Sequence, residues 1–269
     1  MNHQHETYDV AFSLGAACAC SVALRKAKLQ FASFPLDWMA GGTITERASL
    51  IATRFDRWLE KEDFEYTGTN PVNGLGMFRN KRTGMTHLHD FTDSPIEESY
   101  AKVREKYLRR TERLFSLCDN AHRILCVYVS RPAVARSSIG ELHDARRLLA
   151  ETFPTATVDL LHFENMPDCS LRDRRCSKLE EGLFQIEFDY HDPQRDVNIN
   201  DVAAALVAEG FSAKDYRTAA EKRAYELANK MKKYRVKTRT GLLMARIIAQ
   251  LQRMIGIKPK TSNPILMKP

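Results

Sequence analysis

Residues 123–129 read Arg-Ile-Leu-Cys-Val-Tyr-Val, a nearly continuous apolar run. Such a run is typical of a strand that is buried on both faces in the centre of a parallel sheet. Segments that favour strands alternate with segments of helical periodicity from residue 8 to residue 209. This alternation predicts an α/β fold with a mostly parallel sheet and helices on both faces, a Rossmann-like three-layer sandwich. The expected strands are residues 8–14, 86–91, 123–129, 157–163 and 183–188, and the expected helices are residues 16–28, 43–59, 95–118, 140–153, 201–209 and 213–234.

Two stretches interrupt this pattern. Residues 31–38 are apolar and aromatic but contain Pro35, which favours an edge strand or an extended loop. Residues 66–84 are rich in Gly, Asn and Pro, so we expect an irregular segment that is either functional or mobile. Between these stretches, Thr43 and Glu46 have the spacing of a capping box at the start of a helix.

The net charge of +7 is unevenly distributed along the 269 residues. Residues 227–269 contain eleven Lys or Arg and no Asp or Glu, so residues 1–226 carry a net charge of −4. The basic character therefore belongs to the C-terminal tail, which argues against a nucleic-acid-binding body. The N-terminus shows no signal peptide and the sequence has no run of about 18 apolar residues, so we expect a cytoplasmic protein with reduced cysteines.

We divide the chain into four segments. Residues 1–6 and 257–269 are expected to be disordered tails, residues 7–212 form the α/β domain, and residues 213–256 form C-terminal helices. The last of these helices is basic and amphipathic, and it needs another apolar surface. Three alternatives stay open: packing on the body, packing on a partner, or peripheral contact with the inner face of a membrane through residues 230–256. The oligomeric state does not follow from the sequence.

Cys18 is the main candidate for chemistry. It follows Ser13-Leu14-Gly15-Ala16-Ala17, where a strand ends and a helix begins. A thiol in the first turn of a helix lies near unpaired backbone N–H groups, so we expect a lowered pKa. The groups of Ser13, Gly15 and Ala17 could hold an oxyanion or a phosphate. The alternative is a small cysteine that packs under the turn.

A thiolate nucleophile needs a base and a group that orients the base. His87 and His89 share one face of the strand expected at residues 86–91, and either could face Cys18. In a regular strand Asp90 points away from His89, and Asp37 is the alternative orienting carboxylate.

Metal and cofactor sites are not expected. Cys18 and Cys20 are two residues apart on a helix, so their side chains should diverge. The sequence contains neither a P-loop nor a Gly-x-Gly-x-x-Gly motif.

Three short motifs resemble a bacterial family labelled papain-like cysteine peptidase. They are Ser13-Leu14-Gly15-x-x-Cys18 with Leu24-Arg25, then Ser33-x-Pro35-Leu36-Asp37-Trp38, and finally His89-Asp90-Phe91. The resemblance covers roughly residues 7–165 and implies a Cys18–His89 pair with Asp37 or Asp90 as a third member. Ser33, Trp38 and His87 are then expected to line the substrate pocket. Papain-like enzymes carry their histidine on an antiparallel barrel, whereas the strand–helix alternation here favours a thiol hydrolase on a Rossmann-like sheet.

Three functions remain open at this stage. The first is a cysteine-nucleophile hydrolase or acyltransferase with His89 as the base and an acyl or peptide substrate. The second is a transferase or binding protein for a phosphorylated donor, such as a nucleotide sugar or coenzyme A, in surface-polysaccharide assembly, with Arg79, Lys81 and Arg82 as phosphate ligands. The third is a non-catalytic module that binds a partner through the tail.

Overall fold

The computed structural model describes residues 7–233 except residues 16, 94 and 133–135. The chain divides into two compact units, Met1–Tyr216 and Arg217–Pro269. The last of the C-terminal helices predicted within residues 213–256 and both predicted tails lie outside the described residues.

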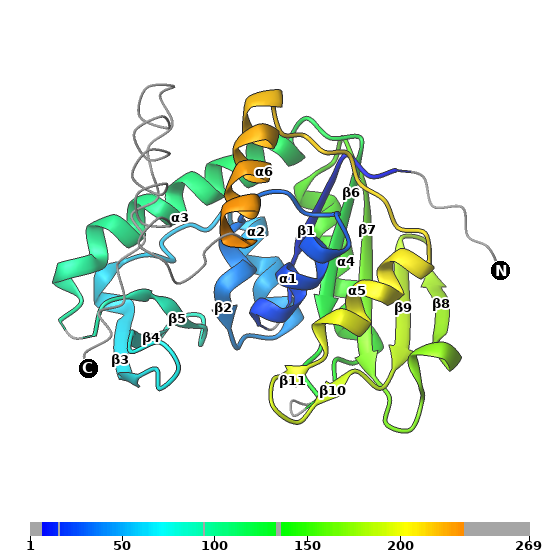
Figure 1. The fold of residues 1–269 in the computed structure, drawn as a ribbon, viewed down its shortest axis with the longest axis horizontal. Helices are drawn as coiled ribbons and strands as arrows, with labels where there is room; N and C mark the ends of the chain where they lie inside the picture. Colours follow the sequence, from blue (N-terminus) through cyan, green and yellow to red (C-terminus); the bar gives the residue numbers. More distant parts are fainter. Residues whose placement is uncertain (1–6, 16, 94, 133–135, 234–269) are drawn as a thin grey trace. The chain divides into compact units, whose positions relative to one another are not determined.

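A five-stranded sheet forms the centre of the first unit, in the order β1-β6-β7-β9-β8 (Figure 1). Four of its strands are parallel, and the edge strand β8 is antiparallel to β9. Six of the seven residues of β6 are buried, which explains its continuous apolar sequence. The predicted mostly parallel sheet is confirmed. The strands are β1 (Val10–Ser13), β6 (Arg123–Val129), β7 (Thr157–Asn165), β8 (Arg175–Glu180) and β9 (Leu183–Phe188).

Helices cover both faces of this sheet, as the alternation predicted. Helices α1 (Cys18–Lys26) and α5 (Ile199–Ala208) pack against the face that presents Leu125 and Val127. Helices α2 (Ile44–Ala52) and α4 (Ile139–Thr152) pack against the opposite face. Because successive strand residues point to opposite faces, each strand contributes to both apolar layers.

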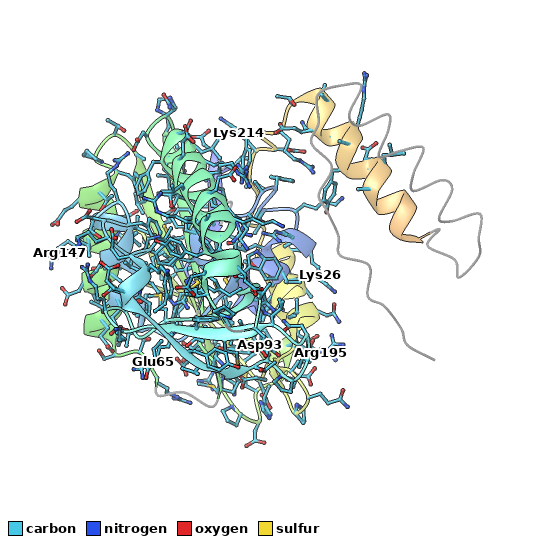
Figure 2. The ribbon with its side chains drawn as sticks, turned by 90° about the vertical axis from the view of Figure 1, so that its left-hand side faces the viewer. Lys26, Glu65, Asp93, Arg147, Arg195 and Lys214 are labelled. Atoms are coloured by element: carbon cyan, nitrogen blue, oxygen red, sulfur yellow. The ribbon has the colours of Figure 1, made fainter. Side chains whose placement is uncertain are left out.

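A polar contact joins α1 and α5. Lys26 at the end of α1 (labelled in Figure 2) donates a hydrogen bond to Asn200 of α5 at 2.5 Å. The predicted capping box of Thr43 and Glu46 is confirmed at the start of α2.

A second sheet was not predicted from the sequence. It is antiparallel, with the order β2-β5-β4-β3, and its strands include residues 66–69 and 76–80 of the segment expected to be irregular. Asn70 and Asn80 hold its turns, because each side-chain oxygen accepts backbone N–H groups two or three residues ahead. The expectation for residues 66–84 is therefore wrong, since the turn residues that suggested a loop connect short strands. These strands are β2 (Met39–Ala40), β3 (Phe64–Thr69), β4 (Gly76–Asn80) and β5 (Thr86–Phe91).

The segment before β2 also differs in part from its prediction. Residues 31–34 are the extended loop that was one of the two alternatives, whereas Pro35–Trp38 form a 3-10 helix, η1, with Pro35 in the first turn where its missing N–H costs nothing. The long helix α3 (Glu97–Cys118) then packs against η1 and β5 and leads into β6. The remaining short elements of this unit are η2 (Lys61–Asp63), η3 (Leu171–Asp173), β10 (His191–Asp192) and β11 (Asp196–Val197).

The second unit begins with α6 (Ala219–Lys233), which starts six residues later than expected. Thr218 and Glu221 cap its N-terminus by exchanging hydrogen bonds between side chains and backbone N–H groups. Within the described part of the chain, none of the helices combines the length and the apolar character needed to cross a membrane.

Candidate active site

Cys18 is the first residue of α1 and lies just beyond the carboxyl end of β1. The turn before it requires glycine, because a Cβ on Gly15 would lie 2.3 Å from the Cβ of Cys20. Ser13 stabilises the turn, since its Oγ accepts the N–H of Gly15 at 3.1 Å. Cys20 points into the core and donates to the carbonyl of Val127 at 3.3 Å. The two cysteines therefore diverge, as helical geometry predicts.

The thiol of Cys18 is partly buried and forms no hydrogen bond with any other described residue. Burial raises its pKa, whereas its own backbone N–H and the positive charge of Arg131 act in the opposite direction. The expectation of a lowered pKa is wrong for this conformation, because the loss of solvation outweighs the helix terminus.

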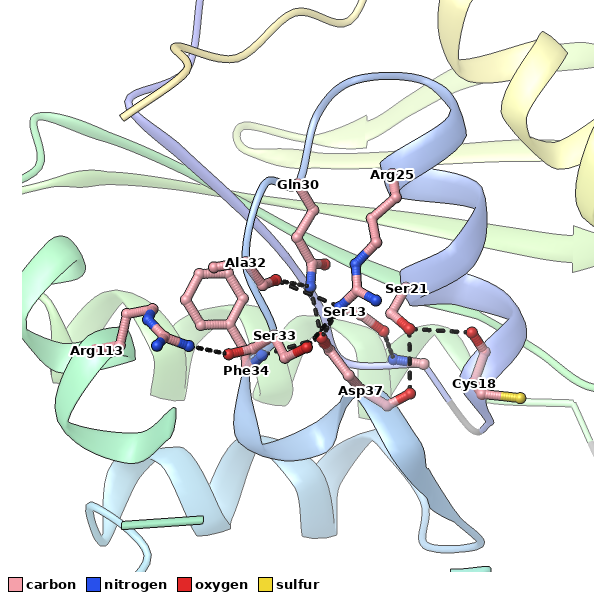
Figure 3. Close-up of polar contacts among 11 residues, drawn as sticks. Ser13, Cys18, Ser21, Arg25, Gln30, Ala32, Ser33, Phe34, Asp37 and Arg113 are labelled. Atoms are coloured by element: carbon pink, nitrogen blue, oxygen red, sulfur yellow. Dashed lines mark hydrogen bonds and ion pairs between the residues drawn. The ribbon is translucent and has the colours of Figure 1, made fainter. Parts of the chain in front are cut away.

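Asp37 lies beside α1, is fully buried and accepts several hydrogen bonds (Figure 3). Its Oδ2 accepts from Arg25 at 2.6 Å, from the side chain of Gln30 at 2.7 Å and from the N–H of Phe34 at 3.0 Å. Burial raises the pKa of Asp37 even though Arg25 favours the charged form. Arg25 also donates to Ser33, so Asp37 and Ser33 hold the loop before η1 against α1. Among the described residues, no histidine contacts Asp37.

A short chain of contacts links Cys18 to His89. Ser21 Oγ donates to the carbonyl oxygens of Cys18 and Asp37 (Figure 3), at distances of 3.0 Å and 3.1 Å. The adjacent Trp38 packs edge-to-face with His89, with ring centroids 6.1 Å apart. No hydrogen bond joins Cys18 to His89 in the part of the chain that is described.

A bulge in β5 separates the two histidines. Gly76 pairs with Phe91, and Phe78 pairs with His87. A step of two residues along β4 therefore lies opposite a step of four residues along β5. The extra residues place His87 and Asp90 on the same side, with Nδ1 of His87 3.0 Å from Oδ2 of Asp90. His87 is fully buried, whereas His89 is exposed. The expectation that His87 and His89 share one face is therefore wrong, and His87 belongs to the core.

Asp90 is held on several sides. Lys106 donates to Oδ1, and Tyr107 donates to Oδ2 at 2.5 Å. Burial alone would raise the pKa of Asp90, but the hydrogen bond and charge of His87 and the charge of Lys106 lower it well below its ordinary value. Asp90 is thus an ionised carboxylate that orients His87.

Asn73 is the residue that orients His89, and it was not among the site residues predicted from the sequence. Its Nδ2 lies 2.9 Å from Nδ1 of His89 and also donates to the carbonyl of Leu88 at 3.1 Å. Its Oδ1 accepts the N–H of Leu75 at 2.9 Å, which sets the orientation of the amide. The signal in the sequence was the Asn73-Gly74 turn immediately before a strand.

A pocket of about 330 Å³ opens beside His89. It is lined by Trp38, His89, Asp90, Lys106 and Arg110, and we call it the Trp38 pocket.

Both cationic residues of the Trp38 pocket come from α3, and neither was predicted. The residues that we expected to bind phosphate lie elsewhere. Arg79 lies on β4, and Lys81 and Arg82 lie in the turn that follows it, where Arg82 is 3.9 Å from Asp63.

Comparison with known proteins identifies the family. A family model described as "Putative papain-like cysteine peptidase" matches residues 9–152, more than half of the chain. The chain belongs to this family. An uncharacterized protein of Acanthamoeba polyphaga mimivirus is 27% identical over 150 residues, which cover 49% of this chain and 67% of the viral protein. No solved structure gives a significant match.

This member of the family combines two layouts that the sequence analysis treated as alternatives. Cys18 lies on the helix that follows the first strand of a parallel sheet, whereas His89 lies on an antiparallel sheet. The family match spans both residues and the whole Trp38 pocket.

A second polar cluster spans the ends of β6, β7 and β9 and extends beyond the family match. Nε2 of the buried His162 lies 2.7 Å from Ser130 Oγ and 3.5 Å from Glu164, and its Nδ1 lies 3.3 Å from Gln185. Burial lowers the pKa of His162 to about 4, so the ring is neutral near pH 7. His162 lies in the strand predicted at residues 157–163, but the sequence did not show its burial, and its partners lie on β7, on β9 and just after β6.

Neither the residues around the Trp38 pocket nor the polar cluster around His162 resembles a metal centre. Within the described residues, no three or more His, Cys, Asp or Glu side chains gather in a way that could hold a metal ion.

Proposed function

We propose that this chain is a thiol-dependent hydrolase of peptide or related amide bonds, with Cys18 as the nucleophile. The observation that carries the proposal is the position of Cys18 at the first residue of α1, beyond the carboxyl end of a parallel strand. Ligands of open α/β sheets bind at this edge. Cys20, Cys118 and Cys126 are buried in the core and could not reach a substrate.

The start of α1 can stabilise an oxyanion. Ala17 occupies the N-cap and offers no side chain to the N–H groups of the first turn. These donors lie beside the Cys18 sulfur, where the carbonyl oxygen of a bound acyl group would become negative.

The proposed reaction has two stages. The sulfur bonds to the carbonyl carbon while its proton passes to a base, and the amine leaves with a proton to give a thioester. Water then attacks the thioester and regenerates the thiol and a carboxylic acid.

We assign the base to His89. Asn73 donates to Nδ1, so the neutral ring carries its proton on Nε2 in this conformation. Nδ1 of His89 can therefore accept the proton of Cys18 only after it gives up the hydrogen bond from Asn73, and we assign this change to substrate binding. Catalytic hydrogen bonds often form only in the substrate complex.

Turnover of a peptide pool tests the proposal. Cys18→Ser should reduce cleavage to background, and His89→Gln should slow it by about 100-fold. Cys169→Ser is the matched control, because Cys169 is also a partly exposed thiol but lies outside the family match. Full activity of a folded Cys18→Ser protein would exclude Cys18 as the nucleophile.

A further inference from the structure

We propose that the Trp38 pocket binds a carboxylate of the substrate, so that the protein selects acidic peptides. The inference that the ligand is a substrate rests on the proposed hydrolase function. The test measures binding alone and does not depend on that function.

Arg110 supplies the main attraction for an anion. Its guanidinium lies 4.9 Å from the centre of the Tyr107 ring and its charge favours the ionised form of the buried Asp37, but no residue that the structure describes pairs with it within 4.0 Å. One of its nitrogens, Nη1, is buried without a hydrogen-bond partner. A cation in this state gains most from a ligand that accepts charged hydrogen bonds, and the planar guanidinium fits a carboxylate.

The other groups of the pocket set the charge of the ligand. Lys106 pairs with Asp90, and the Asn73 contact leaves the neutral form of His89 with an Nε2–H donor. Asp37 is balanced by Arg25 at 2.6 Å. With Lys106 and Arg110 counted against Asp90, these three residues of the pocket carry a net charge of about one positive unit. This balance favours a monoanion over a phosphate dianion.

The aromatic wall of the pocket and its contacts toward α1 suit a peptide ligand. Trp38 forms an aromatic wall, held by Arg25 at 5.3 Å from the ring centre and by the edge-to-face contact with His89. The contacts through Ser21 connect this wall to the start of α1, where Cys18 lies. A side-chain carboxylate in the pocket would therefore fix a peptide near the thiol.

Trp38 fluorescence provides a test that needs no turnover. The protein has two tryptophans, and the other, Trp58, is buried in the core. We would titrate the Cys18→Ala protein with acetyl-Ala-Glu-Ala-amide, its Gln counterpart and its phosphoserine counterpart. The Glu peptide should change the fluorescence and bind at least 10-fold more tightly than the Gln peptide. The signal should disappear in Trp38→Phe.

Substitutions on α3 identify the cation. Arg110→Gln should weaken binding of the Glu peptide by about 10- to 100-fold, and Arg110→Lys should restore part of the loss. Arg109→Gln is the control, because Arg109 is exposed and pairs with Glu105 at 2.8 Å. Equal affinity for the Glu and Gln peptides, or no effect of Arg110→Gln, would overturn the proposal. Tighter binding of the phosphoserine peptide would overturn the choice of a carboxylate.

The two proposals fail separately. Selective binding of the Glu peptide by a protein that cleaves nothing would refute the hydrolase and keep the pocket. Cleavage that depends on Cys18, without selective binding, would refute only the pocket.

Discussion

The side-chain amide of Asn73 lies 2.9 Å from Nδ1 of His89, and this contact determines which ring nitrogen carries the proton. An amide nitrogen can only donate, so Nδ1 must accept. The neutral ring then offers an N–H at Nε2 to the Trp38 pocket.

The tautomer of His89 gives the first prediction. Long-range ¹H–¹⁵N correlation spectra of the native protein should show the Nε2–H form. Asn73→Asp should switch the neutral ring to the Nδ1–H form, because a carboxylate only accepts. Asn73→Ala removes the contact and should give a mixture. A native protein in the Nδ1–H form would contradict the geometry.

The turn before Cys18 gives a second prediction. Gly15→Ala should lower the free energy of unfolding by about 3 kcal/mol, because the new Cβ overlaps Cys20 and the start of α1 must shift. Urea unfolding measures this cost. Gly140→Ala is the control at the start of another helix, where the nearest heavy atom is 3.9 Å away. That substitution should be neutral or stabilising. Equal costs at the two positions would show that the Gly15 turn is not tightly packed.

The ion pair of Arg25 and Asp37 gives a third prediction. Each single substitution, Arg25→Gln or Asp37→Asn, should cost about 3 kcal/mol, because the remaining charged group loses its partner in a largely buried site. The double variant should cost clearly less than the sum of the two, as measured by a double-mutant cycle in urea. Additive costs would mean that Asp37 stabilises the loop through Gln30 and Phe34 alone.

The pH dependence of Cys18 alkylation gives a fourth prediction. Burial raises the pKa of Cys18, so its reaction with iodoacetamide should rise with pH and reach its midpoint above the value of an ordinary free cysteine. Arg131→Gln should move the midpoint further upward, because the positive charge of Arg131 favours the thiolate. A site-resolved mass measurement separates Cys18 from the other thiols. A midpoint below the ordinary value would show that the free protein already holds an activated thiolate.

The parallel strands were predictable because their buried apolar residues follow recognisable patterns. The bounds of β6 and β9 agree with the prediction residue for residue: β6 is a continuous apolar run, whereas β9 has buried apolar residues around the partly exposed Gln185 and Glu187. By contrast, β3 is mostly exposed and carries Glu65, Tyr66 and Thr67, a pattern that does not separate a strand from a loop.

The candidate site was only partly predictable. Cys18, Trp38 and His89 followed from local patterns and from the resemblance. The bulge in β5 depends on pairing with β4, so the separation of His87 from His89 could not be read from one strand. Lys106 and Arg110 lie on a helix with many charged residues, and only the packing of α3 beside η1 singles them out.

The most direct test of the central claim is the identity of the cysteine that a substrate-like electrophile labels. An acidic peptide with a C-terminal vinyl sulfone would be incubated with the full chain near pH 7, and the adduct would be located by peptide mass mapping. The account predicts an adduct on Cys18 and slower labelling in His89→Gln and Arg110→Gln. Labelling of Cys169 or Cys176 at the same rate as Cys18, or no adduct on Cys18, would contradict it.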